Sequence, residues 1–139
     1  MFNFFNKENK KKIENPLIKI AALLVHAAKI DENYTQKERE LIKKAIIELG
    51  SKNEMSDNIL LKAEEIEKKS HQILDFTKEI KNMDEDSKFK IIEILWNIVY
   101  SDNNPDMYEN NLMRRLTGLL YLNPKIVGDI KEKVKNKFK

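Results

Sequence analysis

Apolar residues recur at steps of three and four along most of the chain, which is the spacing of one face of an α-helix. The clearest stretch is SKFKIIEILWNIVY, residues 87–100. It is apolar around much of its circumference and is therefore predicted to lie at the centre of a helix bundle. No stretch alternates with a period of two between hairpin turns. We therefore predict an all-α fold, a compact bundle of about seven helices with no sheet.

Prolines and a glycine mark several of the predicted helix ends. Pro16 suits the first turn of a helix over residues 16–29, and Pro124 suits the first turn of the last helix. Gly50 is predicted to cap the helix that ends with Leu49. In the charged middle of the chain, two further helices are predicted from two apolar sets: Leu60, Leu61 and Ile66, and then Ile73, Phe76 and Ile80.

Two acidic segments lie between predicted helices and share one outline. They are DENYTQKE, residues 31–38, and DNNPDMYE, residues 102–109. An offset of 71 residues aligns them, together with apolar positions on both sides (Leu24 with Leu95, Asp31 with Asp102, Asn33 with Asn104, Glu38 with Glu109, Leu41 with Leu112). The bundle is therefore predicted to be built on a duplicated helix–acidic loop–helix unit.

Neither acidic loop is an EF-hand. Asp102, Asn104 and Asp106 imitate the first, third and fifth ligand positions of that motif. The twelfth position, which requires a bidentate Glu, is Met113 here and Ile42 in the first copy. The sharp-turn glycine is absent from both loops as well, so any cation site must have another design.

Helix capping is the simplest role for these segments. Thr35-Gln-Lys-Glu38 is a capping box, and the segment from Asp106 to Glu109 imitates one. Capping does not explain Asp31 and Asp102, which are expected to bind loop amides or arginines. The three arginines, Arg39, Arg114 and Arg115, all lie in the helices that follow the two loops, where a carboxylate–arginine network or a partner surface is predicted. A divalent-cation site of oxygen ligands is the alternative.

The same residues resemble the TerB-like family. Its members include the tellurite-resistance protein TerB, the N-terminal domains of some DnaJ-type co-chaperones, and small stand-alone proteins. The family pattern is an apolar helix ending in Asp-Gly with a Glu seven residues after the Asp, in two copies. The resemblance covers roughly residues 16–124. The family glycine is Glu32 in the first loop and Asn103 in the second, so the second loop is the better candidate for an ion site.

Composition and charge divide the chain into an arm and one domain. Of 139 residues, 35% are charged and none is cysteine, which excludes disulfides and thiolate sites. Residues 1–15 carry a net charge of +2 and residues 125–139 carry +4, so the middle carries −3. We predict a flexible aromatic and basic arm over residues 1–15 and a single domain over 16–136. Basic charge confined to the ends argues against nucleic-acid binding.

The arm suggests one further partner. Phe2, Phe4 and Phe5 precede a lysine cluster, an arrangement that suits contact with an anionic lipid surface. The chain lacks the apolar core of a signal peptide and any apolar run of 18 residues. A cytoplasmic location is expected, with peripheral membrane association through the arm as an addition.

The function expected from this resemblance is a non-enzymatic interaction module of stress or tellurite response. It would present its acidic loops to a protein partner, with Ca²⁺ or Mg²⁺ held by oxygen ligands or with no cofactor. The tentative ligands are Asp31, Glu38, Asp102, Asn104, Asp106 and Glu109. Two alternatives are a metal-assisted hydrolase using the same carboxylates and a membrane adaptor using the arm. No nucleophile–base or phosphate-loop motif supports catalysis.

Overall fold

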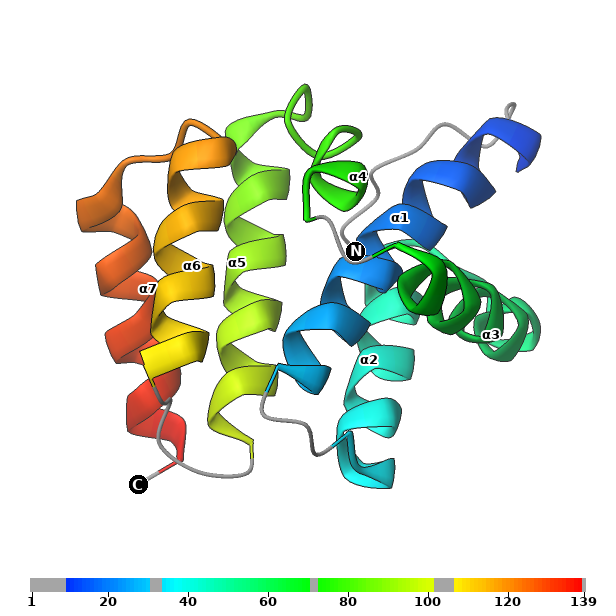
Figure 1. Ribbon diagram of the computed structural model, residues 1–139, viewed down its shortest axis with the longest axis horizontal. Helices are drawn as coiled ribbons and strands as arrows, with labels where there is room; N and C mark the ends of the chain where they lie inside the picture. The colour runs from blue at the N-terminus through cyan, green and yellow to red at the C-terminus, as the bar shows by residue number, and fades with distance from the viewer. Residues whose placement is uncertain (1–9, 31–33, 71–72, 102–106, 139) are drawn as a thin grey trace.

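A computed structural model describes residues 10–30, 34–70, 73–101 and 107–138, with side chains described from residue 16 onward. Within these ranges the chain forms helices and no strand (Figure 1). The seven described helices are α1 (Lys10–Lys29), α2 (Gln36–Glu48), α3 (Asn53–Lys69), α4 (Leu74–Thr77), α5 (Glu85–Tyr100), α6 (Met107–Leu119) and α7 (Pro124–Lys137). The prediction of an all-α bundle is confirmed.

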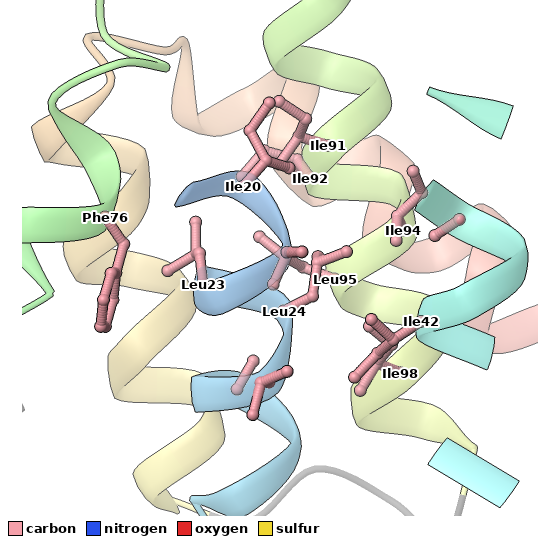
Figure 2. Packing of buried hydrophobic residues seen from close by; sticks show 14 of the residues in the cluster. Ile20, Leu23, Leu24, Ile42, Phe76, Ile91, Ile92, Ile94, Leu95 and Ile98 are labelled. Atoms are coloured by element: carbon pink, nitrogen blue, oxygen red, sulfur yellow. The ribbon is translucent and has the colours of Figure 1, made fainter. Parts of the chain in front are cut away.

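Helices α1 and α5 share the centre of the bundle. α1 packs against α2, α3, α4 and α5, while α5 also contacts α2 and α7. Leu24 of α1 and Leu95 of α5 point toward one another where the two helices meet, and both are completely buried (Figure 2). The predicted central position of residues 87–100 is confirmed, although α1 is as deeply buried as α5.

Two predicted helices differ from the observed ones. α1 begins at Lys10, so Pro16 lies inside this helix and not in its first turn. A proline removes one backbone donor from a helix, and here the helix continues on both sides of it. In the middle of the chain, α4 has only 4 residues. Around it, Ile73, Phe76 and Ile80 are buried by consecutive tight turns closed by bonds such as Phe76 N–H to Ile73 C=O.

The duplication extends to the way the second helix of each copy ends. After α2, the amide of Ser51 donates to the carbonyl of Ile46. Gly50, directly before Ser51, has a φ of 125°. After α6, the amide of Leu122 donates to Thr117, and Tyr121 has a φ of 56°. Each pair of positions differs by the same 71 residues. Both ends are Schellman motifs, and the predicted cap at Gly50 is confirmed.

Candidate functional site

The parts of the chain that flank the two acidic loops lie at one end of the molecule. α1 and α5 end there, and α2 and α6 begin there, at the bottom of Figure 1. A hydrogen bond joins the two copies at this end, because Lys37 Nζ donates to the carbonyl of Ser101 at 2.8 Å. The duplication therefore brings together the residues before and after both loops.

Glu38 and Glu109 occupy equivalent positions at this end. Each is the third residue of its helix, and their exposed fractions are 3% and 8%. Glu38 completes the predicted capping box: its Oε1 accepts from the Thr35 amide at 3.0 Å, while the Glu38 amide donates to Thr35 Oγ1 at 3.1 Å. The capping box thus fixes the start of α2.

The other tentative metal ligands, Asp31, Asp102, Asn104 and Asp106, lie outside the described residues. So do the aromatic residues of the arm, Phe2, Phe4 and Phe5. Among the described residues, no group of three His, Asp or Glu side chains is placed to hold a metal ion.

Arg39 binds a carboxylate from a different element. Its Nε and Nη2 donate to the two carboxylate oxygens of Glu64 in α3, at 3.0 and 3.2 Å. The hydroxyl of Tyr34 donates to Glu64 Oε2 at 2.7 Å. This cluster of Tyr34, Arg39 and Glu64 joins the first acidic segment and the start of α2 to α3. Sequence analysis placed Arg39 in a network but did not identify Glu64 as its partner.

The cluster shifts the titration of its members. Burial alone would raise the pKa of Glu64, but the hydrogen bonds from Arg39 and Tyr34 hold that pKa below its usual range. Burial, followed by the hydrogen bond to Glu64, raises the pKa of Tyr34 well above its usual range. The contacts in the cluster therefore favour a charged Glu64 and a neutral Tyr34.

A second carboxylate of α3 continues this polar layer. Glu67 is 5% exposed; it accepts from Lys29 Nζ at 2.8 Å and lies 3.3 Å from His26 Nδ1. His26 is half-buried, and the centre of its ring lies 6.0 Å from that of Phe76. Sequence analysis missed both glutamates. The available signal was their spacing, because Leu60, Glu64 and Glu67 follow one helix face.

The remaining described candidates are exposed. Arg114 and Arg115 lie on the solvent side of α6. At the start of the same helix, Met107 and Tyr108 are 66% and 64% exposed. Tyrosine and methionine are enriched in protein interfaces, so an adjacent exposed pair is a candidate contact surface. Neither residue was singled out from the sequence.

The arrangement defines a class of protein: an all-α bundle of two helix–loop–helix copies with their loop ends side by side. A family model described as tellurite resistance protein TerB matches residues 17–132. The chain therefore belongs to the TerB family, and the match extends beyond the predicted range into α7. Comparison with curated proteins and with solved structures gave no match. Within the described residues, no helix has the length and apolar character needed to cross a membrane.

Proposed function

We propose that this TerB-family domain is a non-enzymatic interaction module whose working surface is the end that carries both acidic loops. The observation that carries the proposal is the exposure of Met107 and Tyr108, which lie at the end of the second acidic segment, where α6 begins. Aromatic residues dominate the binding energy of many interfaces, while surrounding charges steer the partner. The expected partner is a protein with a basic surface around an apolar centre.

Ca²⁺ or Mg²⁺ is the second part of the proposal. Both ions prefer carboxylate and amide oxygens, which are the groups offered by Asp102, Asn104 and Asp106 together with Glu109 and, from the first loop, Asp31. A bound ion would change the net charge of the acidic end. The cation would then control when the partner binds, a role that fits a stress-response protein.

Ion binding is tested by thermal unfolding of chelator-stripped protein with added Ca²⁺, Mg²⁺, Mn²⁺ or Zn²⁺. An ion at a hundred times its Kd stabilises the fold by about 2.7 kcal/mol, a rise in Tm of about ten degrees. Asp102→Ala should abolish that rise. If no ion raises Tm and Asp102→Ala only destabilises the protein, the cation part is wrong and the loops serve as helix caps.

Partner binding is tested separately by comparing proteins captured by wild type, Tyr108→Ala and Tyr121→Ala. Tyr121 is the matched control because it is 71% exposed and follows the other end of α6. The proposal requires a partner that Tyr108→Ala loses and Tyr121→Ala retains. A partner set unchanged by Tyr108→Ala and by Asp102→Ala would remove the acidic end from the interface.

A further inference from the structure

A cavity open to solvent lies between α6 and α7, over one side of α5, and begins at Asn110, directly after the second acidic segment. It has a volume of about 540 Å³, within the range of small-molecule sites. Trp96 of α5 lines it, and Gly118 and Gly128 line it from α6 and α7. A Cβ added at either glycine would meet no atom within 4 Å. The missing side chains therefore keep this space open.

The charged side chains that line the cavity are both cations. They are Arg114 and Lys131, and no Asp or Glu is found among the described lining residues. Lys131 Nζ is 3.2 Å from Asn110 Oδ1 and 5.1 Å from the centre of the Trp96 ring. Arg114 is exposed. A guanidinium offers a planar set of donors, a geometry that matches a carboxylate.

Trp96 adds an aromatic ring at the same place. The residue is 3% exposed, and its indole Nε1 is buried without a hydrogen-bond partner in the described part of the chain. Because Nε1 is buried, a ligand in the cavity would meet the ring of Trp96 and not its N–H group. Apolar lining residues such as Met113, Leu122 and Val127 would contact the rest of the ligand.

We propose that this cavity binds a small organic carboxylate with an apolar body. The carboxylate would lie between Arg114 and Lys131, and the apolar body would lie on Trp96 between the two glycines. This site goes beyond the proposed interaction function, and none of the candidate cation ligands lines it. A negative result in the ion or partner experiments would therefore not count against the carboxylate site.

Trp96 is the sole tryptophan of the chain and lines this cavity, so a ligand bound there should change its fluorescence. The full-length protein is titrated with octanoate, 3-phenylpropanoate and octan-1-ol. The two acids distinguish an aliphatic from an aromatic body, and the alcohol lacks the charge. A ligand of about ten heavy atoms should bind with a Kd of about 1 mM or tighter. At least one acid should give a saturable change, with octan-1-ol about tenfold weaker.

Three variants locate the binding. Arg114→Gln removes a charge from the lining, and Arg115→Gln is its matched control because Arg115 is exposed on the same helix outside the lining. Gly128→Leu places a side chain into the open space while improving helix propensity, so it is expected to fold. Arg114→Gln and Gly128→Leu should each raise the Kd about tenfold, and Arg115→Gln should leave it unchanged.

Several outcomes would overturn the proposal. One is the absence of a saturable change with both acids. A second is octan-1-ol binding as tightly as the acids, which would mark an apolar groove without anion recognition. The third is an equal effect of Arg114→Gln and Arg115→Gln, or no effect of Gly128→Leu in a folded variant, because binding would then lie elsewhere.

Discussion

At the scale of single side chains, the protonation of Glu64 is coupled to folding. Its carboxylate binds Arg39 and Tyr34, and its pKa is lower than in the unfolded chain. The charged form therefore stabilises the fold above the unfolded pKa, near 4.5, and this contribution is lost as the pH falls through the lower folded value. Acid should loosen the attachment of the residues after the first acidic loop to α3.

Glu64→Gln tests this at constant size. At pH 7 the variant should lose about 1–3 kcal/mol of unfolding free energy, because a charged hydrogen-bond acceptor is replaced by a neutral amide. The difference from wild type should shrink below pH 4.5, where wild type loses the same interaction. Urea unfolding at several pH values measures it. The control is Glu65→Gln, at an exposed residue paired with Lys69, expected to change stability by less than about 0.5 kcal/mol.

A difference in unfolding free energy between wild type and Glu64→Gln that stays constant down to pH 3 would contradict the assignment of Glu64 as the titrating group.

The contrast between Glu64 and Glu38 shows which side-chain contacts a sequence can predict. The partners of Glu38 in its capping box are three residues away, so spacing alone predicted them. The partner of Glu64 is 25 residues away, and only the packing of α3 against α2 brings the two together.

At the scale of elements, the two copies end their second helix with the same turn but with different residues. Gly50 and Tyr121 both have positive φ, and a side chain in that region costs about 1 kcal/mol. Gly50→Ala should therefore destabilise the fold by about 1 kcal/mol or more. Tyr121→Gly should be more stable than Tyr121→Ala by about the same amount. Both Tyr121 variants lose the contact with Lys81, so their difference isolates the backbone.

Chemical denaturation of the four proteins measures these differences. Equal stability of Tyr121→Gly and Tyr121→Ala would mean that this turn changes shape when the tyrosine is removed.

The sequence predicted some of the helices and turns correctly and others not, and each case has a physical reason. The 71-residue offset predicted both copies because matching residues imply matching turns. The length of α4 was not predictable, since tight turns and an α-helix both bury residues at three- and four-residue steps.

At the scale of the whole molecule, the two copies share one interior. Leu24 of the first copy and Leu95 of the second are completely buried where α1 meets α5. The Lys37–Ser101 bond joins the copies again at the acidic end. Because α1 and α5 pack against each other, we expect the two copies to unfold together. The apolar pattern predicted that both helices are buried, but their contact depends on the tertiary arrangement.

This arrangement predicts a single unfolding transition. Leu24→Ala should lower the unfolding free energy by about 2–5 kcal/mol, and Leu95→Ala by a similar amount, because each leaves a cavity at the shared interface. Helix content by circular dichroism reports on both copies, while Trp96 fluorescence reports on the second copy. The two signals should change together in every variant. If Leu24→Ala shifted the helix signal and left the Trp96 transition in place, the copies would be separate folding units and the shared interior would not hold them together.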